Sequence, residues 1–217
     1  MHGKTKKPNL ATAGAHSPLK TTDPASHHRF RHGDAPVEAA GGPKLVLLGV
    51  LLVAQLMVIL DITAVNIALP SLSRDLEISG SSISWTITSY SLIFGSLLLF
   101  GGRAADLLGR RRMFLTGLGI FTASSFASAM AGTAGALFAA RAGQGLGAAM
   151  LSPAALAIIM TAFQGNQRAK ALAAWGAVGG AGAAIGVLVG GLLTEVDWRL
   201  IFYVNLPVAA ALAIAAL

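Results

Sequence analysis

Apolar residues fill six long runs of the sequence, and short polar breaks separate these runs. A helix rises about 1.5 Å per residue, so roughly 20 apolar residues cross the hydrocarbon core of a bilayer, which is about 30 Å thick. The pattern therefore predicts an all-α integral membrane protein with a bundle of six spans. We place the spans at residues 45–69, 83–101, 113–131, 136–161, 171–193 and 200–217.

The first 44 residues lack an apolar period and are rich in Pro, Gly, Ser, His and charge. Such a composition is typical of disorder, and the apolar run of a signal peptide would begin earlier. We therefore expect residues 1–44 to form a retained, disordered, basic tail. Its His27, His28 and His32 could bind a metal, but no carboxylate cluster accompanies them, so solvated side chains are the preferred interpretation.

The composition agrees with a membrane protein and narrows the chemistry. Of the 217 residues, 54% are hydrophobic and 12% are charged, whereas soluble domains have about 25% charged residues. The absence of cysteine excludes disulfides, thiolate metal sites and cysteine nucleophiles. The predicted spans contain no histidine. We therefore expect neither an enzyme nor a cofactor.

Basic residues are distributed unevenly between the two ends of the predicted spans. The tail and the breaks at 102–112 and 162–170 lie on one side and hold 13 of the 16 Lys and Arg residues. The opposite breaks hold only Arg74 and Arg199. Because short cytoplasmic segments are enriched in Lys and Arg, we predict a multi-pass protein of the cell membrane with a cytoplasmic N-terminus. The sparse charges of the tail, mixed with acids, argue against nucleic acid as a partner.

Asp61 interrupts the first apolar run about eight residues before its end, which places it about 12 Å inside the hydrocarbon. An acid at this depth normally faces a cavity or a partner, although an interfacial position is the alternative. The same span carries a second stripe at helical spacing, formed by Gln55, Ile59, Ile62 and Asn66. This stripe lies about 120° from Asp61, so we expect polar groups on two faces of the helix.

Arg141 lies about five residues into the fourth predicted span, at a depth close to that of Asp61. We expect the two side chains to approach each other across a polar cavity. The alternative is that Arg141 extends to the outer headgroups. In the fifth span, Gly182, Gly186 and Gly190 recur every four residues and Gly191 follows, a pattern that favours close helix packing.

Four ordered segments resemble the major facilitator superfamily, and more narrowly its fourteen-span drug:proton antiporter branch. Residues 102–112, GRAADLLGRRR, are similar to the loop between its second and third spans, with matches at Gly102, Asp106, Gly109, Arg110 and Arg111. LFAARAGQGLGAA, residues 137–149, resembles the motif of its fourth span, including Arg141 and Gln144. LDITAVNIALP and WRLIFYVNLP resemble its first-span signature and the start of its sixth span.

The fifth-span antiporter motif of the family falls on GAAIGVLVGG, residues 182–191, where Val187 occupies the usual proline position. The resemblance implies a bundle whose first and fourth spans line a central cavity and which works by alternating access. It implies that Asp61, Arg141, Gln144 and Asn66 couple proton and substrate movement. Residues 102–111 would form a cytoplasmic gating loop, with topogenic charge as the alternative role of its arginines.

Complete transporters of this family have two six-helix halves, and 217 residues match only the N-terminal half. A truncated product, a half-transporter that pairs with another chain, and a protein that no longer transports would all fit this length. The leading interpretation is multidrug efflux of lipophilic small molecules, cationic ones among the candidates, powered by the proton gradient. A small-solute symporter or uniporter and a non-transporting interaction protein are the alternatives. The expected partners are the lipid bilayer, protons, the substrate, and a C-terminal half or partner membrane chain.

Overall fold

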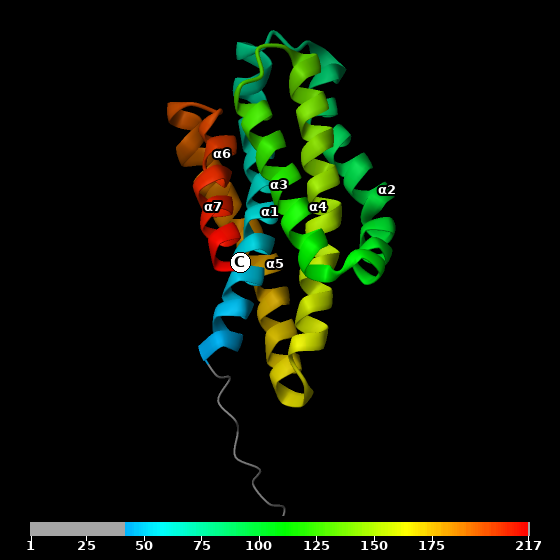
Figure 1. The fold of residues 1–217 in the computed structure, drawn as a ribbon. Coiled ribbons are helices and arrows are strands. Elements are labelled where there is room, and N and C mark those ends of the chain that lie inside the picture. The colour runs from blue at the N-terminus through cyan, green and yellow to red at the C-terminus, as the bar shows by residue number, and fades with distance from the viewer. Residues whose placement is uncertain (1–41, 217) are drawn as a thin grey trace, which may run out of the picture. The chain divides into compact units, whose positions relative to one another are not determined.

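A computed structural model describes residues 42–216, and these residues are almost entirely helical, with no strand among them (Figure 1). This confirms the predicted all-α class. The long helices are α1 (Gly42–Asp75), α2 (Trp85–Leu108), α3 (Arg110–Ala129), α4 (Ala134–Ala162) and α5 (Gly165–Val196). A short 3₁₀ turn, η1 (Gly80–Ser84), precedes α2, and the chain ends with α6 (Leu200–Tyr203) and α7 (Asn205–Ala216).

Several boundaries differ from the sequence-based prediction. Gly42–Lys44, assigned to the tail, instead form the first turn of α1, where Pro43 is tolerated because the first turn has no partner for its missing N–H. The remainder of the predicted tail, with its histidines, lies outside the described residues. The helix also continues past Pro70 to Asp75, because Leu72 is fully buried in the core.

The break predicted at 102–112 is not a loop. Helix α2 continues to Leu108 and α3 starts at Arg110, so Gly109 alone separates them. Its φ of +97° lies in the left-handed region, which residues with a Cβ rarely adopt. The sixth predicted span is likewise two helices, since Val204 interrupts it between α6 and α7.

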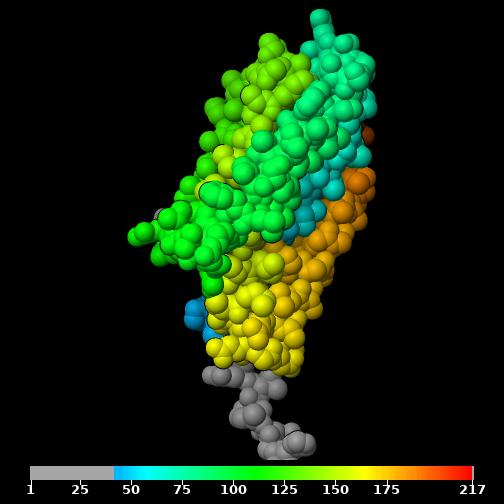
Figure 2. Space-filling view, turned by 90° about the vertical axis from the view of Figure 1, so that its right-hand side faces the viewer, coloured from blue at the N-terminus to red at the C-terminus, as the bar shows by residue number. Residues whose placement is uncertain are grey.

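Four helices are long and apolar enough to cross a membrane, namely α1, α2 together with η1, α4 and α5. The pair α6–α7 forms a shorter apolar segment, and α3 carries three arginines in its first turn. Helix α4 packs along α2 and α3, while α1 packs along α5. In the space-filling view, the middle of α1 is visible as a cyan strip between α2 and α5 (Figure 2).

The interior has two apolar clusters. One gathers residues of α1, α3, α4 and α7 that include Met57, Phe121, Ala148 and Ala209. The other lies toward the opposite end of α1, α3 and α4 and includes Val65, Ala129 and Leu137, together with Phe202 of α6. The buried polar residues Asp61, Ser125, Ser128, Arg141, Gln144 and Asn205 lie between these clusters in the sequence of each helix. The polar side chains therefore form a layer, called the polar layer below, between the two apolar clusters.

Candidate functional site

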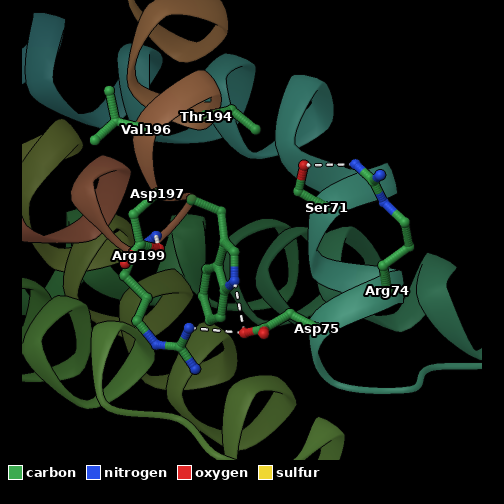
Figure 3. Close-up of a pocket in the computed structure, with 8 residues that line it drawn as sticks. Ser71, Arg74, Asp75, Thr194, Val196, Asp197 and Arg199 are labelled. Atoms are coloured by element: carbon green, nitrogen blue, oxygen red, sulfur yellow. Dashed lines mark hydrogen bonds and ion pairs between the residues drawn. The ribbon is translucent and has the colours of Figure 1, made fainter.

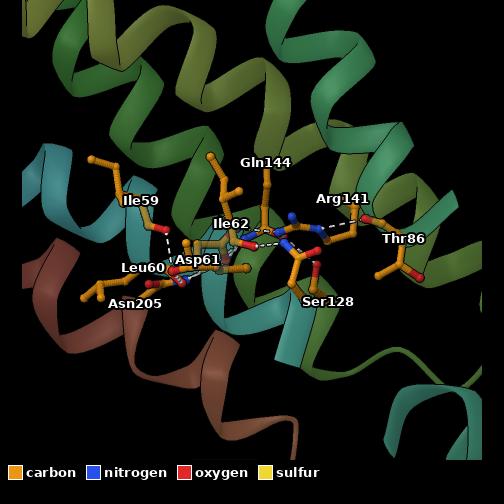
Figure 4. A network of polar contacts seen from close by, with 12 residues as sticks. Ile59, Leu60, Asp61, Ile62, Thr86, Ser128, Arg141, Gln144 and Asn205 are labelled. Carbon is orange, nitrogen blue, oxygen red and sulfur yellow. Dashed lines mark hydrogen bonds and ion pairs between the residues drawn. The ribbon is translucent and has the colours of Figure 1, made fainter. Parts of the chain in front are cut away.

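Asp61 of α1 and Arg141 of α4 form a buried ion pair (Figure 4). Arg141 Nη1 donates to Asp61 Oδ2 at 2.5 Å, and both side chains are at most 1% exposed. The approach expected from their similar depth is therefore present. The alternative, an arginine extending to the headgroups, is wrong because the guanidinium is enclosed by helices.

Gln144, one turn after Arg141, connects the two charged groups. Its amide nitrogen donates to Asp61 Oδ1 at 2.8 Å and to Ser125 Oγ at 2.7 Å. Its amide oxygen accepts hydrogen bonds from Arg141 Nη1 at 2.9 Å and from Ser128 Oγ at 3.0 Å. Gln144 thus fixes the geometry of the pair from within α4 and ties it to α3.

The guanidinium of Arg141 is held on its other side by α2. Its Nε donates to the backbone oxygen of Thr86 at 3.2 Å, and its Cζ lies 4.5 Å from the centre of the Tyr90 ring. A cation over an aromatic face is attracted by the ring quadrupole. Residues of α1, α2 and α4 therefore meet at this arginine, and Asp61 compensates its charge.

Asn205, the first residue of α7, also contacts Asp61, although no sequence pattern marked it within the quoted WRLIFYVNLP segment. Its amide nitrogen donates to Asp61 Oδ1 at 3.2 Å and to Ser125 Oγ at 2.8 Å. The residue is 3% exposed. A lone asparagine before Pro207 offered no periodic signal, and it reaches Asp61 through the packing of α7 against α1 and α3.

The predicted stripe of polar residues on α1 does not join this network. The amide of Asn66 donates to the backbone oxygen of Ile62 at 2.7 Å, and the side chain is exposed. Gln55 accepts from Ser152 Oγ at 3.0 Å, closer to the other end of α1. Asn66 and Asp61 thus lie in different surroundings.

The predicted gating residues lie around the junction of α2 and α3. Asp106 and Arg110 form an exposed ion pair at 3.4 Å, one turn apart. Arg110 also donates to the backbone oxygen of Ala157 on α4 at 3.4 Å, and Arg111 donates to that of Ala216 at the end of α7 at 3.0 Å. The arginines therefore link α3 to two other helices. Gly102 faces Pro153 of α4, where an added Cβ would be 3.7 Å away.

Three of the four predicted packing glycines lie against α1. A Cβ at Gly182 would lie 3.0 Å from the side chain of Leu56, and one at Gly190 would lie 2.7 Å from the backbone of Ala64. A Cβ at Gly186 would approach the side chain of Thr63 still more closely. Gly191 is the exception, because its added Cβ would meet open space. The position after Gly190 turns about 100° away from α1, so Gly191 makes no such contact among residues 42–216 and its packing role stays a prediction.

A second aspartate of α1, Asp75, lies six residues beyond the predicted first span and is half exposed. It accepts from Arg199 Nη1 at 2.7 Å and from Trp198 Nε1 at 3.0 Å, in a pocket between α1 and the α5–α6 connection (Figure 3). Arg199 also donates to the backbone oxygen of Ala131 and stacks over Trp198. The hydrogen bonds from Arg199 and Trp198 hold the pKa of Asp75 below its usual value.

A small apolar cavity of about 120 Å³ lies beside the buried pair. Residues of α1, α5, α6 and α7 line it, and Asp61 and Asn205 form part of its wall. Among residues 42–216, no group of three or more His, Asp or Glu side chains could hold a metal ion.

Comparisons with known proteins agree with this architecture. Residues 51–217 match the family model of the Major Facilitator Superfamily. The chain is 56% identical over 164 residues to the puromycin resistance protein pur8 of Streptomyces alboniger. This match covers 75% of this chain and 33% of that protein. It is 45% identical over 157 residues to the cephamycin export protein CmcT of Amycolatopsis lactamdurans, covering 71% of this chain and 32% of that protein. It thus spans about a third of the length of these curated relatives.

A solved structure has the same fold. It is the inward-facing, occupied form of a bacterial homolog of the human lysosomal transporter Spinster, with a TM-score of 0.68 and 18% identity. The match covers 82% of this chain and 45% of that one. Together with the apolar helices, these matches establish a multi-pass membrane protein, and the chain belongs to the Major Facilitator Superfamily.

Proposed function

We propose that this chain forms the N-terminal six-helix part of a proton-coupled exporter of lipophilic small molecules. The buried network of Asp61, Arg141 and Gln144 is the observation that carries the proposal. An ionisable pair inside a membrane bundle is expensive and normally belongs to a proton or substrate pathway. The relatives named for antibiotic resistance and export support a drug-like substrate.

In this proposal, Asp61 exchanges the proton and Arg141 responds to it. Protonation removes the negative charge that compensates Arg141, so the pair between α1 and α4 loses its Coulombic attraction. Gln144 holds both partners and would transmit the change along α4. Entry of one proton charge down the membrane potential supplies about 2.3 kcal/mol per 100 mV. This is enough to bias two arrangements of packed helices.

The exposed residues of α1 and α5 suit substrate contact better than proton transfer. Asn66 is exposed and bonded only to its own helix, so we assign it to the substrate path. The apolar cavity beside Asp61 favours lipophilic molecules, and the acid itself favours cationic ones. No cofactor is required, because the proton gradient supplies the energy.

The α2–α3 junction would act as the cytoplasmic gate. Gly102, Asp106, Gly109, Arg110 and Arg111 place charged groups where α3 meets α4 and α7. This location agrees with an N-terminus in the cytoplasm, as the distribution of basic residues favours. The stripe of Gly182, Gly186 and Gly190 would keep α1 and α5 moving as one unit.

Two observations favour other candidates. Val187 replaces the expected proline on α5 and is 49% exposed, which favours a small-solute symporter or uniporter over an antiporter. Large exposed apolar side chains also cover α2 and α5, including Leu99, Phe100, Leu188 and Leu192. Lipid, a C-terminal half or a partner membrane chain must cover them, and a non-transporting interaction protein would use the same surface.

Efflux of ethidium, a lipophilic cation, from cells that express the chain tests the proposal. The chain should be expressed alone and together with any membrane segment encoded directly downstream. We expect efflux that a proton uncoupler abolishes and that Asp61→Asn removes, whereas the matched change Asp75→Asn leaves it intact. Efflux that survives both the uncoupler and Asp61→Asn contradicts proton coupling through Asp61. Copurification of a second membrane protein without any efflux supports the interaction protein.

A further inference from the structure

The carboxylate of Asp61 receives hydrogen bonds from two helices that lie far from α1 in the sequence. Arg141 and Gln144 come from α4, and Asn205 comes from α7. The amides of Gln144 and Asn205 both donate to Asp61 Oδ1. Both amides also donate to Ser125 Oγ. Asp61, Gln144, Ser125 and Asn205 therefore close a ring of hydrogen bonds across α1, α3, α4 and α7.

Asn205 lies directly after the short interruption between α6 and α7. Val204 separates the two helices, although its N–H still donates to the Leu200 oxygen at 3.0 Å, and Asn205 begins the next helix. Ile201 and Phe202 before the break are buried in one apolar cluster, and Ala209 and Leu212 after it are buried in the other. Asn205 therefore lies between the two clusters, next to Asp61 in the polar layer (Figure 4). Asp61 and Ser125 accept hydrogen bonds from its amide.

Hydrogen bonding rather than tight packing holds this amide. The apolar cavity of about 120 Å³ lies directly beside Asn205 and Asp61, between α1, α5 and α7. Free space of this size would let the side chain or the start of α7 move if the carboxylate stopped attracting it. A neutral carboxyl is a much weaker acceptor than a carboxylate.

We propose that Asn205 is a positioning residue for Asp61, and that its amide transmits the charge state of Asp61 to α7. While Asp61 is ionised, Asn205 anchors α7 to α1 and α3. When Asp61 is neutral, this anchor weakens and the start of α7 can move into the cavity. The inference rests on the proposed function only in taking Asp61 as the group that changes charge.

Infrared difference spectra of the full 217-residue chain in dodecyl maltoside micelles test the positioning role directly. The Asp61 carboxylate band is first assigned by comparison with Asp61→Asn. Asn205→Leu should shift this band because one donor to Oδ1 is lost, while Asn66→Leu, an exposed amide on α1, should leave it unchanged. Asn205→Gln should restore the band in part, since the cavity can accept one more methylene. Asn205→Ala gives the same test if the leucine variant does not fold. An unshifted band in the leucine and alanine variants overturns the proposal.

Transmission to α7 is tested by thiol labelling, because the chain has no cysteine of its own. Val208→Cys lines the cavity on α7, and Val187→Cys on the exposed side of α5 is the control. We expect Asp61→Asn and Asn205→Leu each to raise the reaction rate of Cys at 208 with N-ethylmaleimide about tenfold, the size expected for one lost bond to a charged group. The double variant should react no faster than either single variant, and the control site should not change.

Additive rate increases, or an equal increase at position 187, would mean that Asn205 has only a general structural role and would overturn transmission. Neither measurement requires transport. If ethidium efflux proves independent of protons while the band shift and the labelling results hold, the proposed function fails and the role of Asn205 stands. If efflux depends on Asp61 but the band does not shift, the opposite conclusion follows.

Discussion

Helix α1 carries two aspartates that each bind an arginine, in opposite surroundings. Asp61 and Arg141 are at most 1% exposed, whereas Arg199 and Asp75 are 31% and 48% exposed. Both arginines also lie over an aromatic ring, at 4.5 Å for Tyr90 and 4.3 Å for Trp198. The local chemistry is almost the same, so the difference in environment decides what each pair can do.

A buried pair and an exposed pair respond differently to the loss of one charge. Water and salt compensate a charge left alone at the surface, and such pairs contribute little to stability. A charge that loses its partner between two apolar clusters is left without compensation. Both charges of a buried pair must therefore be removed or neutralised together. The buried pair is therefore suited to a switch driven by one proton, and the exposed pair to joining the ends of helices.

The largest effect should come from breaking the buried pair. Arg141→Met leaves the buried carboxyl group of Asp61 without its main partner and should lower the free energy of unfolding by about 3–5 kcal/mol. Unfolding of the chain in mixed micelles by added dodecyl sulfate, followed by circular dichroism, measures this change. Asp61→Asn combined with Arg141→Met should recover much of the loss. A loss no larger than that of Arg199→Met would remove the distinction between the pairs.

A smaller effect should come from pushing α1 away from the polar layer. Gly190→Ala places a methyl group 2.7 Å from the backbone of Ala64, three residues after Asp61. Overpacking of this kind typically costs about 1–3 kcal/mol. The same unfolding measurement applies, and Gly191→Ala, which faces open space, is the matched control. Equal effects at both positions would show that helix propensity, and not the contact with α1, is responsible.

The exposed pair should be sensitive to salt, and the buried pair should not. At about 1 M salt the screening length falls to roughly 3 Å, so the Coulombic attraction between Asp75 and Arg199 should be largely lost. Raising NaCl should therefore shrink the small effect of Arg199→Met on unfolding and leave the effect of Arg141→Met unchanged. A salt-dependent effect of Arg141→Met would mean that water reaches the polar layer.

The smallest effect concerns pH at the exposed pair. The pKa of Asp75 is held below its usual value by hydrogen bonds from Arg199 and Trp198. Its contribution to stability is therefore fully present above the unfolded pKa of about 3.9 and is lost as the pH falls below that value. Comparison of wild type with Asp75→Asn between pH 6 and pH 3 should show a stability difference that shrinks toward the acid end, since it is lost only as the pH falls through the lowered folded pKa of Asp75. A difference that grows toward low pH would contradict this sign.

The sequence predicted the central pair well, because depth in a membrane helix follows directly from counting residues. Asp61 and Arg141 lie at similar depth on spans that run in opposite directions, and a buried charge requires a partner. The glycine stripe was also readable, since a spacing of four keeps residues on one helix face. Gly191 does not follow this spacing, and a Cβ added there would meet open space.

Other features of the site could not be read from local patterns. Asn66 lies on the same helical stripe as Ile62. Its amide donates to the backbone oxygen of Ile62, and it does not contact Asp61. Asn205, Ser125 and Ser128 are isolated polar residues in apolar helices, and only the three-dimensional packing brings them together. The α2–α3 connection looked like a loop because its charges are dense, yet both helices extend through them up to Gly109.

The polar layer also constrains the order in which the chain can be completed during synthesis. Asp61 precedes Arg141 by 80 residues and Asn205 by 144. At about 5–20 residues per second, roughly 4–16 s pass before the arginine is made. During this interval the acid in α1 has no charged partner from its own chain in the bilayer. We expect the insertion machinery, or protonation of Asp61, to shelter this helix until α4 arrives, and α7 to add the last hydrogen bond.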